Sequence, residues 1–158
     1  MAHVITHEIK QIKDLRIVGH LIQTTMTAVM SNNPIPAFWG ELISDGRYEK
    51  LMATPSDCPC TYGACLMHTE EDMDYTVGVA LPEGAAVPEG LHLVEMPAGE
   101  YMAVEVELKN LHAGFGYANE WMEKEGYTWA HGGSFELYPD TGMDKPTDLH
   151  LYIPIMRK

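Results

Sequence analysis

The chain has 158 residues, of which 46% are hydrophobic and 21% charged, and this composition is typical of a single globular domain rather than a disordered or membrane-spanning chain. Its 23 acidic and 10 basic side chains give a formal net charge of −13, which repels phosphate backbones and attracts cations. We therefore expect one domain over residues 1–158, with no direct nucleic-acid partner and no membrane partner, although an acidic surface also serves solubility alone.

The first half of the chain reads as two strands, a helix and two further strands. Residues 3–12 and 15–22 are rich in β-branched residues around a Lys-Asp break, which is typical of strands. Pro34 and Pro36 suit a first helical turn, and apolar residues at helical spacing then predict a helix over 34–46. Strands are expected at 62–68 and 75–81. The start of the chain has charges scattered through it and no apolar core, so we expect no secretory leader and a cytoplasmic location.

Three cysteines, an odd number, argue against a secreted disulfide framework and fit a reducing compartment. Cys58, Cys60, Cys65 and His68 together contain enough soft donors for zinc. Their spacing matches no zinc motif, however, and the strand expected here would place Cys60 and Cys65 on opposite faces. We therefore expect no metal and no cofactor.

The second half repeats the order of the first. After a proline- and glycine-rich loop at 82–90, strands are expected at 91–95 and 100–108, a helix from a cap at Asn110 to about Glu125, and strands at 134–138 and 148–156. The strand at 100–108 alternates an apolar face with a more polar one. The repeated order, strand-strand-helix-strand-strand written twice, predicts an α+β fold in which two helices pack on antiparallel sheets and a near-twofold rotation relates the two halves.

A carboxylate and two phenols are the candidate chemical groups of the last two strands. A period of two places Glu136 and Tyr138 on one face of their strand, opposite Phe135 and Leu137. Tyr152 lies on the face of the last strand that is opposite its apolar residues. If the two strands are neighbours, Glu136, Tyr138 and Tyr152 line one side of a cleft. The alternative is an ordinary solvated sheet face, on which Glu and Tyr are common.

Several short segments resemble the GyrI-like, or AraC-type effector-binding, domain. The segments are IPAFWGEL, YTVGVALPEG, VPEGLHLVEMPAGEYMAVEV, SFELYPD and LHLYIPI, and they extend over nearly the whole chain. The resemblance implies a pseudo-twofold α+β fold with a cleft for lipophilic, often cationic compounds. It also implies that Glu136 lies at the bottom of that cleft and opposes the positive charge of the ligand.

The same resemblance supplies the aromatic residues of the expected site. Trp39 matches the tryptophan of the first helix, and Tyr62 lies on the strand where related proteins often place an aromatic wall residue. Tyr138, Tyr152 and Trp121 complete the expected set. Each aromatic face attracts a cation by roughly 0.5–2 kcal/mol. Trp39 and Trp121 have the alternative of being plain core residues at helical spacing.

The expected function is that of a free-standing protein that binds a small lipophilic cation and sequesters or senses it, acting on transcription only through a regulatory protein partner. Two alternatives stay open. One is a protein-binding inhibitor of the type that acts on gyrase. The other is a hydrolase of strained small molecules, in which Glu136 is a general base and Tyr138 a hydrogen-bond donor. We expect binding rather than catalysis, since the sequence has no nucleophile elbow, phosphate loop or dinucleotide fingerprint beside these residues.

Overall fold

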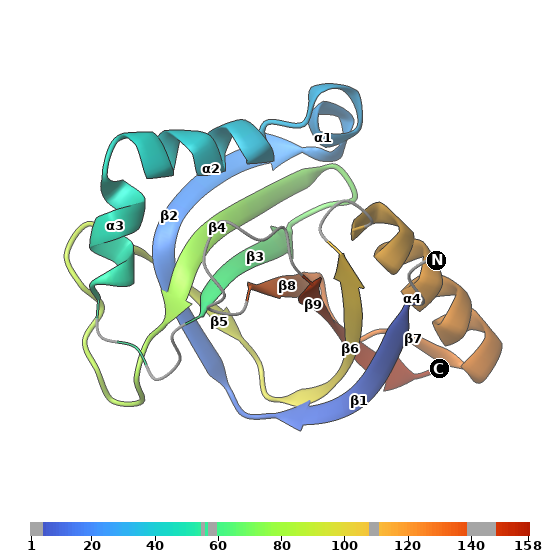
Figure 1. The fold of residues 1–158 in the computed structure, drawn as a ribbon. Helices are drawn as coiled ribbons and strands as arrows, with labels where there is room; N and C mark the ends of the chain where they lie inside the picture. Colours follow the sequence, from blue (N-terminus) through green and yellow to red (C-terminus); the bar gives the residue numbers. More distant parts are fainter. Residues whose placement is uncertain (1–4, 55, 57–59, 108–110, 139–147) are drawn as a thin grey trace.

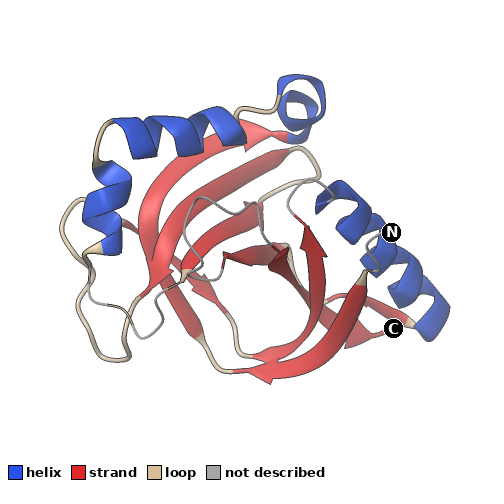
Figure 2. Cartoon of the chain, viewed as in Figure 1, coloured by secondary structure: helices blue, strands red, loops and turns tan. Residues whose placement is uncertain are grey.

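The computed structural model describes residues 5–54, 56, 60–107, 111–138 and 148–158, which form an α+β fold of one large antiparallel sheet and four helices (Figures 1 and 2). The helices are α1 (Met26–Asn32), α2 (Ile35–Ser44), α3 (Arg47–Met52) and α4 (Leu111–Glu125). The strands are β1 (Thr6–Ile12), β2 (Leu15–Thr25), β3 (Thr61–Met67), β4 (Asp72–Ala80), β5 (His92–Met96), β6 (Gly99–Glu107), β7 (Tyr127–Trp129), β8 (Gly133–Tyr138) and β9 (Asp148–Arg157).

The sheet joins the two halves of the chain at its centre. Its strand order is β1-β6-β9-β8-β3-β4-β2-β5, and β7 pairs with β9 off this path. From the central β3–β8 pair outward, the first half contributes β3, β4 and β2, and the second half contributes β8, β9 and β6. Strands β1 and β5 each pair with the opposite half. The pseudo-twofold repeat read from the sequence, with halves that superpose by a twofold rotation, stays a prediction.

The expectation of two helices is wrong, because the described residues contain four. The helix predicted over 34–46 ends at Ser44, and Gly46, with a φ of 86°, then begins the separate helix α3. Helix α1 was missed because it is only seven residues long and its apolar residues, such as Met26 and Val29, are only partly buried. Its N-cap is Thr25, whose side chain accepts a hydrogen bond from the Ala28 backbone N–H at 3.1 Å. The predicted helix cap at Asn110 lies outside the described residues. No helix in the described ranges is long and apolar enough to cross a membrane.

All four helices lie on the outer side of the curved sheet. Figure 1 shows α1, α2 and α3 over β2 and β4, and α4 at the opposite end near β6 and β7. Under α2 and α3, Phe38 and Leu42 pack against Val77 and other residues of β4. Under α4, Ala118 and Met122 pack against β6 and β9. The outer face of the sheet therefore carries two separate apolar clusters, one under each group of helices.

The inner face of the sheet is a third apolar cluster that is rich in aromatic rings. Phe135, Tyr62, Tyr101 and Tyr152 are all buried in it. This corrects the prediction for β6, one face of which was expected to be more polar. That face contributes Tyr101 and Ala103 to the inner cluster, and Tyr101 is only 1% exposed. Both faces of the central strands are therefore buried, one under helices and the other inside the curve of the sheet.

Candidate functional site

Glu136 lies at the centre of the sheet on the outer, helix-bearing face. In the strand register it pairs with Leu151 of β9, which belongs to the cluster under α4. On its other side it pairs with Gly63 of β3, which in turn pairs with Val77 in the cluster under α2. Because paired residues point to the same face of a sheet, Glu136 lies between the two outer clusters. Its exposed fraction is only 8%.

Two phenols hold this buried carboxyl group through a single oxygen. Tyr138, from the same strand, donates to Glu136 Oε1 at 2.6 Å, and Tyr75, from β4, donates to the same oxygen at 2.9 Å. Tyr75 is 1% exposed. The sequence predicted that Glu136 and Tyr138 share a face, and the structure confirms it. Tyr75 was not among the residues expected at this site, because in the sequence it reads as one member of the apolar face of β4.

The missing side chain of Gly63 makes room for this pairing. A Cβ atom at position 63 would lie 2.8 Å from Glu136 Oε1 and closer still to the Tyr75 hydroxyl. Contacts below 3.0 Å are essentially never seen for real Cβ atoms. The sheet therefore admits the Tyr75–Glu136 hydrogen bond only because the residue between their strands is glycine.

The environment of Glu136 disfavours its negative charge. Burial raises the pKa of Glu136 above its ordinary value of 4.5, although the hydrogen bonds from Tyr138 and Tyr75 pull it partly back. Burial also raises the pKa of Tyr75 well above its ordinary value, and the charge of Glu136 adds to the effect. The two phenols therefore remain protonated donors over the whole range in which Glu136 titrates.

Trp39 of α2 covers the two tyrosines. Its indole N–H donates to the Tyr75 hydroxyl at 3.1 Å, and its ring meets the Tyr138 ring edge-on with 5.2 Å between centroids. Tyr48 of α3 lies further along, 6.2 Å from the Trp39 ring. The aromatic faces beside Glu136 thus come from both the sheet and the helices, and the first-helix tryptophan singled out in the sequence belongs to this group.

Tyr152 and Tyr62 lie on the opposite face of the sheet from Glu136, which corrects the expected arrangement. The register pairs Tyr152 with Phe135, one residue before Glu136, and the two rings stack at 4.6 Å. Tyr62 lies 5.8 Å from the Phe135 ring in the same inner cluster. The expected arrangement required Tyr152 and Glu136 to lie side by side. The actual register differs by one residue, which moves the Tyr152 side chain to the other face of the sheet.

Trp121 belongs to a third location. It stacks on Tyr127 of β7 at 5.1 Å and meets His7 of β1 edge-on at 4.9 Å. Its apolar neighbours are those of the cluster under α4. None of its recorded ring contacts within the described residues is with the group around Glu136. The geometry therefore brings together Glu136, Tyr138 and Trp39 and leaves three of the predicted residues apart from them.

The cysteines show a mixed outcome. Cys60 packs on the inner cluster and Cys65 on an outer one, so the predicted separation of these two residues is confirmed. The expectation of reduced thiols fails at Cys60, which is disulfide-bonded, whereas Cys65 is free. Cys58 lies outside the described residues. In the part of the chain that the structure describes, no group of three or more His, Cys, Asp or Glu side chains is arranged to hold a metal ion.

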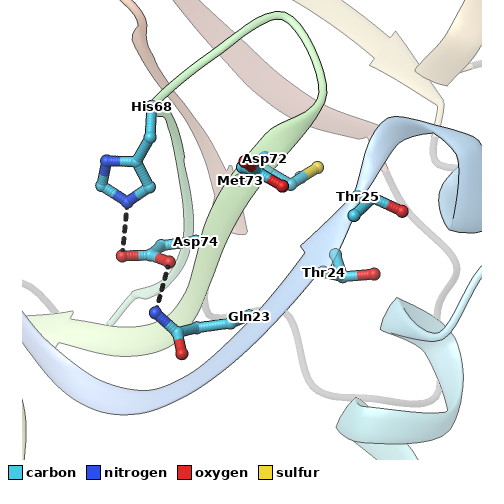
Figure 3. A pocket seen from close by; sticks show the side chains of 7 residues that line it. All are labelled: Gln23, Thr24, Thr25, His68, Asp72, Met73 and Asp74. Atoms are coloured by element: carbon cyan, nitrogen blue, oxygen red, sulfur yellow. Dashed lines mark hydrogen bonds and ion pairs between the residues drawn. The ribbon is translucent and has the colours of Figure 1, made fainter.

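A surface hollow of about 350 Å³ lies at the ends of β2, β3 and β4, and Figure 3 shows its polar side chains. Asp74 accepts hydrogen bonds there from His68 at 2.8 Å and from Gln23 at 3.2 Å. The lining consists of Gln23, Thr24, Thr25, His68, Asp72, Met73 and Asp74. None of these is Phe, Tyr or Trp, and the carboxylate of Asp74 is already paired, so this hollow suits a lipophilic cation less well than the surroundings of Glu136 do.

Comparison with known proteins supports both the fold and the resemblance seen in the sequence. The sequence profile of the Cass2 family, integron-associated effector binding proteins, matches residues 8–155. The structure of SAV2435 bound to tetraphenylphosphonium superposes with a TM-score of 0.79 at 16% identity, covering 96% of this chain and 94% of that one. No curated protein matches the sequence significantly.

Two further solved structures have the same fold. The integron cassette protein VCH_CASS2 of Vibrio cholerae superposes with a TM-score of 0.64 at 15% identity, covering 95% of each chain. The C-terminal domain of EcmrR gives a TM-score of 0.64 at 14% identity, covering 99% of this chain and 100% of that domain. The GyrI-like, effector-binding fold expected from the motifs is thereby confirmed.

Proposed function

Because the chain belongs to the Cass2 family of integron-associated effector binding proteins, we propose that it binds a small lipophilic cation at Glu136 and sequesters or senses it. The single observation that carries this proposal is a carboxyl group buried to 8% exposure between aromatic side chains. The bound cation lies against Tyr75, Tyr138 and Trp39 and is neutralised by Glu136. Tyr62, Tyr152 and Trp121 keep their ligand-binding roles only as predictions of the family resemblance.

A cation suits this site because aromatic rings surround Glu136 and no positively charged side chain is paired with it among the described residues. A buried carboxylate needs a compensating charge, and none of the ion pairs recorded within the described ranges involves Glu136. The rings of Trp39, Tyr75 and Tyr138 each contribute attraction for a cation, worth more when water is excluded. The structure of SAV2435, which has the same fold, contains such a cation, tetraphenylphosphonium.

We favour binding over catalysis because of the direction of one hydrogen bond. A hydrolase of the kind considered above needs Tyr138 to donate to its substrate while Glu136 acts as base. In the structure the Tyr138 hydroxyl donates to Glu136 itself at 2.6 Å. Tyr138 therefore has no second proton to offer a substrate. The gyrase-inhibitor function, a regulatory protein partner and the cytoplasmic location stay predictions of the sequence.

The test is a titration of the purified protein with tetraphenylphosphonium and with the neutral, similarly shaped triphenylphosphine oxide. Replacing Glu136 by Gln keeps the shape of the side chain and removes its charge. A charged hydrogen bond is worth about 1.5–3 kcal/mol, so Glu136→Gln weakens cation binding by about tenfold or more. Binding of the neutral compound changes little.

A matched control is Glu95→Gln, which removes the same charge from an exposed position on β5. This variant binds tetraphenylphosphonium like the parent protein. If Glu136→Gln binds the cation as tightly as Glu95→Gln does, and both variants are folded, Glu136 is not the cation site and the proposal fails.

A further inference from the structure

We propose that the site exchanges a proton for its cation: Glu136 holds a proton on Oε2 in the empty protein and releases it to solvent when a lipophilic cation binds. This inference rests on the proposed function and adds a chemical property to it. It makes the affinity for a permanent cation depend on pH, although the ligand itself does not titrate.

The two oxygens of Glu136 have unequal surroundings. Both phenols donate to Oε1, from Tyr138 at 2.6 Å and from Tyr75 at 2.9 Å. No hydrogen bond to Oε2 is recorded among the described residues. In a neutral carboxylic acid the carbonyl oxygen is the acceptor and the other oxygen carries the proton. Because both donors are on Oε1, Oε2 is the oxygen that is free to carry the proton of the neutral acid.

The groups that face Glu136 do not offer it a positive charge. Tyr75 comes from β4, Tyr138 from β8, Trp39 from α2 and Cys65 from β3, and all are neutral or become negative when they lose a proton. Burial, followed by the charge of Glu136, raises the pKa of Cys65 to about 12. From β9, the residue paired with Glu136 is Leu151. A proton on Glu136 is therefore the available means of neutralising it in the absence of ligand.

Arrival of a cation changes this balance. A positive charge beside the carboxyl group favours its ionised form, so the O–H bond on Oε2 breaks and the proton passes to water or buffer. The net charge of the site is the same before and after the exchange. Below the pKa of the empty site the cation competes with a proton, and its affinity then falls by up to about tenfold for each pH unit.

The experiment is calorimetric titration with tetraphenylphosphonium at a series of pH values, each in two buffers of different ionisation enthalpy: acetate and MES at the acidic end, phosphate and Tris above neutrality. The difference in apparent enthalpy between the two buffers gives the number of protons released. We expect release of up to about one proton per cation at the acidic end, falling towards zero as pH rises through the pKa of the empty site. Glu136→Gln releases none, and Glu95→Gln releases as many as the parent.

A second measurement does not depend on binding. Carbon-13 NMR of the side-chain carboxyl groups, with Glu136 assigned from its absence in Glu136→Gln, follows its ionisation in the ligand-free protein. A titration above the ordinary value of 4.5 supports the inference, whereas one at or below that value overturns it even if the cation binds. Binding without proton release at any pH also overturns it. If tetraphenylphosphonium never binds while Glu136 titrates high, the proposed function fails and the exchange falls with it.

Discussion

Tyr75 and Tyr138 donate to the same oxygen of Glu136, but their other contacts differ. Tyr75 is fully buried and also accepts a hydrogen bond from Trp39, so it links the carboxyl group to helix α2. Tyr138 is half-buried near the end of β8, and its ring meets Trp39 only edge-on. Removing the Tyr75 hydroxyl takes one hydrogen bond from Glu136 and leaves the Trp39 indole N–H without its acceptor, whereas removing that of Tyr138 takes a hydrogen bond from Glu136 alone. Tyr138 is therefore the better position at which to change the carboxyl group alone.

Tyr138→Phe should move the titration of Glu136 to higher pH. The Tyr138 hydrogen bond lowers the pKa of Glu136 because it stabilises the ionised form, so its loss leaves burial less opposed. The carboxyl carbon-13 signal reports the shift. Tyr127→Phe is the control, since this tyrosine lies on β7 and stacks on Trp121. An unchanged Glu136 titration in Tyr138→Phe would show that the phenol does not hold the carboxyl group in solution.

Gly63→Ala should destabilise the protein by about 1–3 kcal/mol and weaken cation binding, because the added methyl group overlaps the Tyr75 hydroxyl and Glu136 Oε1. Urea unfolding measures the loss of stability. Gly116→Ala is the control with the opposite sign. Gly116 lies within α4 with open space around it, so alanine there should stabilise the helix by about 0.5–1 kcal/mol. Equal stability of the two variants would contradict the tight packing at Gly63.

At the scale of secondary structure, the periodic elements were predicted and the short or non-periodic ones were not. The helix at α4 and the strands β3 to β6, β8 and β9 match their predictions within a few residues, because each has a clear apolar face. Helix α1, with seven residues, and strand β7, with three, are too short for their partly buried apolar residues to show a clear period. The alternation of apolar and polar residues within one strand also does not determine the register in which that strand pairs with its neighbour.

That limit decides how much of the site the sequence could reveal. The shared face of Glu136 and Tyr138 follows from the period of one strand and was predicted. The place of Tyr152 depends on how β9 pairs with β8, and the assumed register put it on the wrong face. Tyr75 was missed because its hydroxyl meets a carboxyl group 61 positions away in the chain. Contacts across strands are fixed by the whole sheet rather than by a motif.

Helix α2 covers the site, so binding should change the surroundings of Trp39. With Glu136 only 8% exposed, a ligand of the size of tetraphenylphosphonium reaches it only if the Trp39 side chain moves away from Tyr75. The chain has three tryptophans, so Trp121→Phe with Trp129→Phe leaves Trp39 as the single reporter. Its fluorescence should shift on cation binding. An unchanged Trp39 signal on binding would place the ligand elsewhere.

At the scale of the whole molecule, two kinds of electrostatic attraction act on a cation. The formal charge of −13 creates a field that extends into solvent and concentrates cations near the surface. This attraction is screened over a distance of about 10 Å at 0.1 M salt. Glu136 acts instead at contact and out of water, where screening is weak. The two contributions are therefore separable by ionic strength.

The last prediction compares tetraphenylphosphonium with tetraphenylborate, an anion of nearly the same size and shape. At low salt the parent protein should prefer the cation through both contributions, and added salt should remove only the part that comes from the surface. Glu136→Gln should show the reverse behaviour: its preference for the cation is present at low salt and largely lost at moderate salt. Glu95→Gln, which loses one surface charge of many, should behave like the parent. Competition titrations of the two ions against one fluorescent dye give both affinities. Equal affinity of the parent for the two ions at low and at moderate salt would mean that neither the surface field nor Glu136 selects charge, and the site would then be an apolar pocket without sign preference.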